Sequence, residues 1–154
     1  MTDPLYTPVD ATNGFWQISS PSYSINGTTY PRAGNTSIMD TGTTLCLVDD
    51  DMLAKIYAAV PGAMYDSSVQ GYVFPTATKE SAIPVVELAI GDHMVKLHQD
   101  DFKYAEIDNT YTYGGIQSRG DLPFDIYGDT VFKAMYAVSY PLYTLPLPTL
   151  PELP

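Results

Sequence analysis

The apolar positions of this chain fall in short runs that are separated by turn residues, a pattern that is typical of β-strands. Two of the separators, Asn26-Gly27 and Gly91-Asp92, predict tight hairpins, because these residues tolerate the left-handed backbone that a two-residue turn requires. The runs predict strands at residues 5–9, 14–18, 22–25, 28–31, 37–40, 45–48, 72–74, 85–90, 93–97, 104–107, 110–118, 123–127 and 135–138.

A helical period follows the acidic triplet at residues 49–51, whose carboxylates suit the free amides and the dipole of a helix N-terminus. Four apolar residues then share one helical face at the spacing i, i+3, i+4 and i+7: Leu53, Ile56, Tyr57 and Val60. Pro61-Gly62 ends this helix, and Asp129 is expected to open a shorter one over residues 130–133. The chain is therefore predicted to be all-β with two short helices.

The remaining pattern is organised around the stretch Ile38-Met39-Asp40-Thr41-Gly42-Thr43-Thr44. The apolar residues predict a buried strand that ends at Asp40. Gly42 permits a tight turn whose amides face the carboxylate, and the threonine hydroxyls are available to the same neighbourhood. A carboxylate that is oriented in this way is suited to general acid–base chemistry.

Four further blocks surround this loop in a recognisable order: Gly14-Phe15-Trp16-Gln17-Ile18, Tyr72-Val73-Phe74-Pro75, Gly114-Gly115-Ile116-Gln117-Ser118 and Ile126-Tyr127-Gly128-Asp129-Thr130-Val131-Phe132. Together with Asp40-Thr41-Gly42 they resemble the C-terminal lobe of a fungal pepsin-like aspartic protease, over residues 4–138. The resemblance implies a single lobe of the pepsin-like fold at residues 1–140 and the activity of an aspartic endopeptidase on peptide or protein substrates.

The resemblance also implies roles for individual residues. Asp40 matches the second of two catalytic aspartates, and Thr41 matches the threonine whose hydroxyl locks the two active-site loops together. Gly42 offers its amide to the carboxylate, while Thr43 hydrogen-bonds the outer carboxylate oxygen. The segment that threads beneath the loop and fixes it corresponds to Ile126, Tyr127 and Gly128. The expected substrate-binding residues are Thr44 and Ile116.

In this family two carboxylates share one proton and hold one water, because like charges a few ångströms apart cannot both ionise. The ionised carboxylate activates the water and the other carboxyl protonates the peptide carbonyl, so the resemblance implies no metal and no cofactor. This chain contains one Asp-Thr-Gly loop, since Asp66-Ser67-Ser68 and Asp121-Leu122-Pro123 do not fit the pattern. As a monomer it is expected to be a poor or inactive protease.

Three hypotheses follow for the missing carboxylate. The chain is one lobe of an endopeptidase that needs an N-terminal lobe, or it pairs with itself as an isologous dimer about a twofold axis. The third hypothesis is a non-proteolytic remnant that serves as a binding module or in small-molecule chemistry, which a fold alone does not exclude.

The composition and charge of the chain argue against several classes of binding partner. The net charge of −11 argues against nucleic acid and against anionic membrane surfaces, because no basic patch is available to neutralise phosphates. No apolar run reaches the roughly 20 residues of a membrane span. His93 and His98 have no carboxylate or cysteine pattern around them, so no metal site is predicted. No signal-peptide pattern follows Met1, and the sequence does not indicate the cellular compartment of the protein.

Other features concern modification and the C-terminus. The single cysteine, Cys46, lies in an apolar run and is expected to be a buried thiol. By resemblance, Thr76 and Tyr113 stand where relatives carry a cystine. Two glycosylation sequons, Asn26-Gly27-Thr28 and Asn35-Thr36-Ser37, matter if the chain is secreted. Residues 141–154 are rich in proline and are expected to form a disordered tail.

Overall fold

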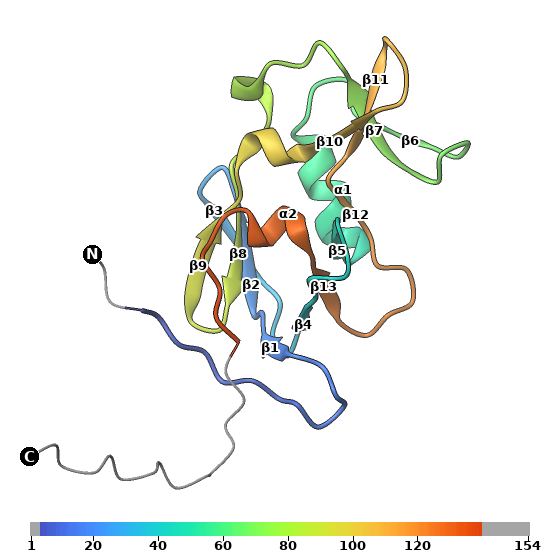
Figure 1. Cartoon of the computed structure of the whole chain (residues 1–154). Helices are drawn as coiled ribbons and strands as arrows, with labels where there is room; N and C mark the ends of the chain where they lie inside the picture. The colour runs from blue at the N-terminus through green and yellow to red at the C-terminus, as the bar shows by residue number, and fades with distance from the viewer. Residues whose placement is uncertain (1–3, 140–154) are drawn as a thin grey trace, which may run out of the picture.

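The computed structural model describes residues 4–139, which form β-sheets with two α-helices and two 3₁₀ turns (Figure 1). The strands are β1 (Gln17–Ser19), β2 (Ser22–Ile25), β3 (Thr28–Pro31), β4 (Thr36–Met39), β5 (Cys46–Val48), β6 (Met64–Asp66), β7 (Gly71–Pro75), β8 (Val86–Ile90), β9 (His93–Lys96), β10 (Lys103–Glu106), β11 (Tyr111–Gly114), β12 (Ile116–Ser118) and β13 (Asp125–Tyr127). The helices are α1 (Asp50–Ala58) and α2 (Asp129–Phe132), and the 3₁₀ turns are η1 (Glu80–Ala82) and η2 (Gln99–Phe102).

The central sheet has five strands in the order β1-β4-β13-β5-β12. Strand β13, from near the end of the described chain, lies between β4 and β5 and is parallel to β4 but antiparallel to β5. The connection from β4 to β5 must therefore cross the end of β13. Asp40 lies at the start of this crossing loop, so strands that are distant in sequence fix its position.

Two four-stranded sheets complete the described fold, in the orders β3-β2-β8-β9 and β10-β11-β7-β6. Figure 1 shows β6, β7, β10 and β11 together at one end of the molecule. The two predicted hairpins are both present, β2–β3 across Asn26-Gly27 and β8–β9 across Gly91-Asp92. The backbone at Asn26 and Gly27 is left-handed, with φ of 50° and 81°, as this type of turn requires.

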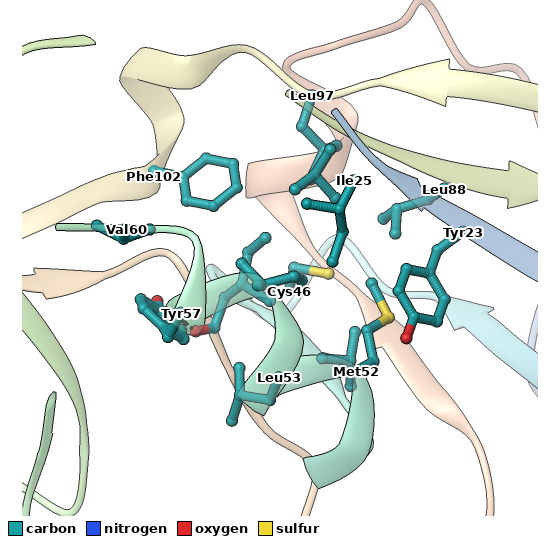
Figure 2. Packing of buried hydrophobic residues seen from close by; sticks show 14 of the residues in the cluster. Tyr23, Ile25, Cys46, Met52, Leu53, Tyr57, Val60, Leu88, Leu97 and Phe102 are labelled. Carbon is teal, nitrogen blue, oxygen red and sulfur yellow. Dashed lines mark hydrogen bonds between the residues drawn. The ribbon is translucent and has the colours of Figure 1, made fainter. Parts of the chain in front are cut away.

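Helix α1 is the helix that the sequence predicted. The Asp49 carboxylate accepts a hydrogen bond of 2.9 Å from the Met52 amide, which is an N-terminal cap. Its apolar face packs into the main hydrophobic cluster, where side chains from α1, β2, β5 and β8 meet (Figure 2). Cys46 is fully buried in this cluster, as expected, and burial raises the pKa of its thiol.

Some predicted strands are wrong at the ends of the described chain. Residues 5–9 form no strand, although a single β-bridge joins Asp10 to Gln17, and Tyr6 is 84% exposed. The predicted strand 135–138 is also absent, and Tyr136 is 95% exposed. Both segments carry strand-forming residues, but no strand within residues 4–139 pairs with them, and an isolated strand is not stable in water.

Two further differences concern the predicted strand 110–118 and a strand that the sequence did not predict. The predicted strand 110–118 is divided into β11 and β12, which belong to different sheets. At the break the Gly115 amide donates to the Phe102 carbonyl at 2.8 Å, and its carbonyl accepts from the Cys46 amide at 2.9 Å. Strand β6 was not predicted, and it forms because β7 pairs with it.

The positions assigned to the relatives' cystine are not paired. Tyr113 pairs with Val73 in the β7–β11 register, whereas the Thr76 hydroxyl lies 3.0 Å from the Thr112 hydroxyl. Among residues 4–139 no helix is long and apolar enough to cross a membrane. The predicted tail at residues 141–154 lies outside the described residues.

Candidate active site

The Asp40 loop is held from below by β13 and the start of α2. The Asp40 amide donates a hydrogen bond of 3.1 Å to the Tyr127 carbonyl, where β13 ends. On the other side of the loop, the Asp129 amide donates to the Thr43 carbonyl at 2.9 Å and the Thr130 amide donates to the Thr44 carbonyl at 3.0 Å. These hydrogen bonds fix the loop through its backbone. The orientation of the Asp40 side chain is determined by other donors, which lie within the loop.

Two donors from within the loop orient the Asp40 carboxylate. The Gly42 amide donates to Oδ1 at 2.9 Å, and the Thr43 hydroxyl donates to Oδ2 at 2.7 Å. The Thr43 hydroxyl and then the Gly42 amide lower the pKa of Asp40 below its ordinary value, because both stabilise the ionised form. Each carboxylate oxygen thus has a fixed donor, and the group stays partly open to solvent.

Thr43→Val is expected to raise the pKa of Asp40, because the substitution removes the hydroxyl that contributes most to lowering it. The measurement is an NMR titration of the Asp40 carboxyl carbon in the purified chain. Thr44→Val is the matched control, since Thr44 is exposed and the carboxylate of Asp40 accepts its hydrogen bonds from Gly42 and Thr43. Equal titration curves for the wild-type chain and Thr43→Val would contradict this assignment.

Gly128 leaves no room for a side chain beneath the loop. A Cβ atom placed there would lie 2.1 Å from the Thr43 carbonyl oxygen and 2.5 Å from the Leu45 carbonyl oxygen. Both neighbours are backbone atoms of the crossing loop, and neither can rotate away as a side chain could. Glycine at this position is thus a condition for the close approach of α2 to the Asp40 loop.

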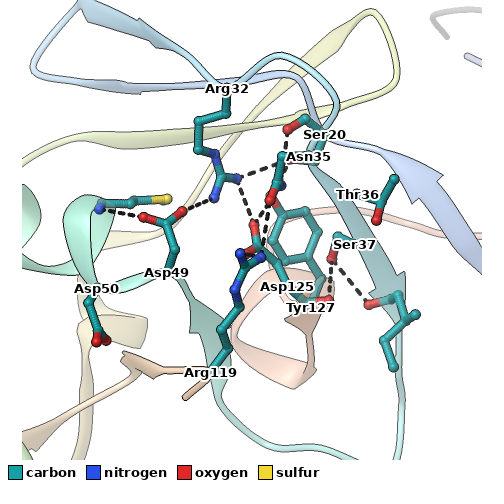
Figure 3. A network of polar contacts seen from close by, with 12 residues as sticks. Ser20, Arg32, Asn35, Thr36, Ser37, Asp49, Asp50, Arg119, Asp125 and Tyr127 are labelled. Atoms are coloured by element: carbon teal, nitrogen blue, oxygen red, sulfur yellow. Dashed lines mark hydrogen bonds and ion pairs between the residues drawn. The ribbon is translucent and has the colours of Figure 1, made fainter. Parts of the chain in front are cut away.

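A network of charged groups surrounds Asp125 at the start of β13, the strand whose last residue holds the Asp40 amide (Figure 3). The Asp125 carboxylate is fully buried and binds two guanidinium groups, Arg32 Nη2 at 2.6 Å and Arg119 Nη1 at 2.7 Å. Arg32 also pairs with Asp49, the residue that caps α1, at 2.7 Å. The network therefore connects β13, the β3–β4 connection and the N-terminus of α1.

Neutral groups complete this network. Asn35 Nδ2 donates to Asp125 Oδ2 at 3.1 Å, and Asn35 Oδ1 accepts from Arg119 Nη1 at 3.1 Å. The hydroxyls of Ser20 and Tyr127 lie 2.6 Å apart. Burial raises the pKa of the Asp125 carboxyl, while the facing guanidinium groups and Asn35 oppose that rise. Because Tyr127 also holds the Asp40 amide, the network supports the strand that carries the loop.

Arg119→Met is expected to lower the free energy of unfolding by about 1.5–3 kcal/mol, the range for a hydrogen bond to a charged group. The variant keeps the apolar stem but leaves Asp125 with one guanidinium partner. Lys55→Met is the matched control, because its pair with Asp51 is exposed and surface pairs of this kind contribute little to stability. Urea unfolding of both variants measures the difference, and equal losses would mean that the Asp125 network is no more stabilising than the surface pair.

A cavity of about 140 Å³ lies beside Asp40. It is lined by Gly14, Phe15, Trp16, Ile38, Met39 and Asp40. The β1–β4 pairing forms it, since the Met39 amide donates to the Trp16 carbonyl at 2.9 Å, and Phe15 is 46% exposed. This partly aromatic surface was not assigned to the site from the sequence, although the adjacent aromatic residues Phe15-Trp16 are the signal that could have revealed it.

The sequence-predicted site residues fall into two groups. Asp40, Gly42 and Thr43 are joined by hydrogen bonds, and Tyr127 and Gly128 lie directly beneath them. Thr41 and Thr44 are exposed at the loop, whereas Ile126 pairs with Ile38 within the sheet. Ile116 is fully buried in the hydrophobic cluster, so in this structure it presents no surface to a substrate.

The described residues contain no group of three or more His, Cys, Asp or Glu side chains that could hold a metal ion. At Asp40 the structure presents a carboxylate that two hydrogen bonds orient, beside a cavity with both aromatic and polar lining.

Comparison with known proteins adds the family. Residues 2–143 match the sequence profile of the family described as eukaryotic aspartyl protease. The chain is 41% identical over 133 residues to aspergillopepsin-1 from Aspergillus pseudoglaucus and to aspergillopepsin-1 from Aspergillus oryzae, and 40% identical over 136 residues to penicillopepsin-1 from Talaromyces stipitatus. Each match covers 86% of this chain and 33% of the relative, so the chain spans about a third of the length of these relatives.

Proposed function

Because the chain belongs to the eukaryotic aspartyl protease family, we propose that it is the C-terminal lobe of an aspartic endopeptidase and supplies Asp40 as one of two catalytic carboxylates. The observation that carries this proposal is the orientation of Asp40 by the Gly42 amide and the Thr43 hydroxyl. These donors lower the pKa of Asp40 and so favour the ionised carboxylate, the form that can accept a proton from water.

The second carboxylate comes from another Asp-Thr-Gly loop, in an N-terminal lobe or in a second copy of this chain. Thr41 is exposed beside Asp40, where its hydroxyl is available to the facing loop. When two carboxylates approach within a few ångströms they share one proton, so one pKa falls and the other rises. The ionised carboxylate then draws a proton from a bound water, and the protonated carboxyl donates to the peptide carbonyl oxygen.

The half-open cavity beside Asp40 provides a place for a substrate side chain. Its lining includes Phe15, Trp16 and Met39, which favour an apolar or aromatic residue near the scissile bond. Exposed Thr44 is a further residue at the rim of the loop that is available for substrate binding.

The test is peptide cleavage by the purified chain at pH 3–5, with and without pepstatin, at several protein concentrations. It is run alone and with a separately expressed lobe that carries the other Asp-Thr-Gly loop. A pepstatin-sensitive rate that rises as the square of the chain concentration indicates a homodimer, and a rate that requires the second lobe indicates a two-lobed enzyme. Absence of cleavage in both arms would contradict the proposal and favour a non-proteolytic binding module.

A further inference from the structure

The chain carries two N-glycosylation sequons, and the structure separates them. We propose that Asn26 is the N-glycosylation site of this chain in a eukaryotic secretory pathway and that Asn35 is excluded. A sequon asparagine is modified on Nδ2. The two sites can therefore be compared by the exposure and hydrogen bonding of that atom and of the hydroxyl two residues later. This inference is independent of the catalytic assignment of Asp40.

Asn26 offers its Nδ2 atom to solvent. The residue is exposed at the tip of the β2–β3 hairpin. Its backbone amide donates to the Val85 carbonyl at 2.8 Å, and its side-chain Oδ1 accepts from the Val85 amide at 2.9 Å. The carboxamide is therefore held through Oδ1, whereas Nδ2 makes no hydrogen bond to the described residues. Glycosylation leaves Oδ1 unchanged, so the hairpin keeps this hydrogen bond.

The rest of the Asn26 sequon is equally open. Thr28 is exposed, and a Cβ atom built on Gly27 would meet no heavy atom within 4 Å. The hairpin belongs to the sheet β3-β2-β8-β9, whereas Asp40 follows a strand of the central sheet (Figure 1). An oligosaccharide at this exposed hairpin tip adds polar surface outside the candidate active site.

Asn35 is in the opposite situation (Figure 3). Its Nδ2 atom donates to the Ser20 carbonyl at 3.2 Å and to Asp125 Oδ2 at 3.1 Å, which uses both of its hydrogens. The hydroxyl of Ser37, the last residue of this sequon, is fully buried and donates to the Asp125 carbonyl at 3.2 Å. A sugar on Asn35 would replace one of the two donated hydrogens, so one of these hydrogen bonds would be lost and the sugar would have to occupy space within the Asp125 network.

The transfer balances with a lipid-diphosphate oligosaccharide as donor. A bond forms between Asn26 Nδ2 and the anomeric carbon of the oligosaccharide, and the bond from that carbon to the diphosphate oxygen breaks. The amide loses one proton, and the lipid diphosphate is the leaving group. No oxidation or reduction takes place.

The experiment is secretion of the full chain behind a cleavable signal peptide from a yeast host, followed by glycopeptide mapping of the secreted protein. We expect one glycan per chain, at Asn26, in the wild-type protein and in Asn35→Gln. The glycan is expected to be lost in Asn26→Gln and in Thr28→Ala, which keeps Asn26 but removes the sequon hydroxyl.

The cell-associated fraction is mapped in the same way, so a chain that is retained in the secretory pathway still reports the state of Asn26. An unoccupied Asn26 in both fractions would overturn the proposal. A glycan on Asn35 in soluble, folded protein would overturn the exclusion of the second sequon, because it would show that the Asp125 network accepts a sugar.

Discussion

Replacing Asp40 by Asn is expected to lower the peptidase activity of the assembled enzyme by on the order of 10²–10⁴-fold, the usual contribution of general acid–base catalysis. The carboxamide cannot accept a proton from water, and it cannot share a proton with a second carboxylate. The fold is expected to survive, because the Asn Oδ1 still accepts from the Gly42 amide and the Thr43 hydroxyl can accept from the new amide nitrogen.

Asp66→Asn is the matched control for this substitution. The Asp66 carboxylate also accepts from a backbone amide and a hydroxyl two residues later, both from Ser68, and these hydrogen bonds likewise lower its pKa. It lies on β6, in a different sheet from Asp40. Rates are measured at pH 3–5 in whichever arm of the cleavage assay gives a measurable wild-type rate. Equal rates for wild-type and Asp40→Asn protein would reject Asp40 as a catalytic residue.

Gly128→Val is expected to destabilise the chain by about 3 kcal/mol or more, at or beyond the usual upper range for overpacking. The new Cβ would overlap the carbonyl oxygens of Thr43 and Leu45, so the crossing loop must move. That movement breaks the hydrogen bonds from the start of α2 to the loop. For a domain of this size the loss corresponds to a fall in Tm of roughly 6–12 °C, which thermal unfolding monitored by circular dichroism measures.

Gly34→Ala separates this clash from the general cost of replacing a glycine. Gly34 has a left-handed backbone with φ of 78°, but a Cβ atom there would meet nothing within 4 Å. Its substitution is expected to cost about 1–2 kcal/mol from backbone strain alone. If Gly128→Val melts at the same temperature as the wild-type chain, the loop is not packed against Gly128 as described.

Much of the fold could be predicted from local sequence. The β2–β3 and β8–β9 hairpins, the Asp49 cap of α1 and the buried stripe of that helix are all present as expected. Each depends on residues that are close in the chain, so turn chemistry, capping and apolar spacing contain the necessary information. The Asp40 loop belongs to the same class, because its two carboxylate donors lie within three residues.

The sequence-based prediction of strands failed where a strand depends on a partner segment from elsewhere in the chain. The segments 5–9 and 135–138 have the composition of strands but pair with no strand in the described part of the chain, whereas β6 forms because β7 lies beside it. Gly115 divides the predicted strand 110–118 between two sheets through hydrogen bonds with Phe102 and Cys46. Strand formation depends on hydrogen bonds to another segment, which a local pattern does not contain.

The sequence by itself determined the family resemblance, the predominance of β-strands and the presence of one oriented carboxylate. Only the tertiary structure showed that Asp125 binds Arg32 and Arg119, residues that lie 93 and 6 positions away in the chain. It also showed that Ile116 is buried in the core and that the two sequon asparagines, Asn26 and Asn35, lie in different environments. Burial and long-range pairing are properties of the assembled sheets, and a buried charge is stable only when the fold brings its partners to it.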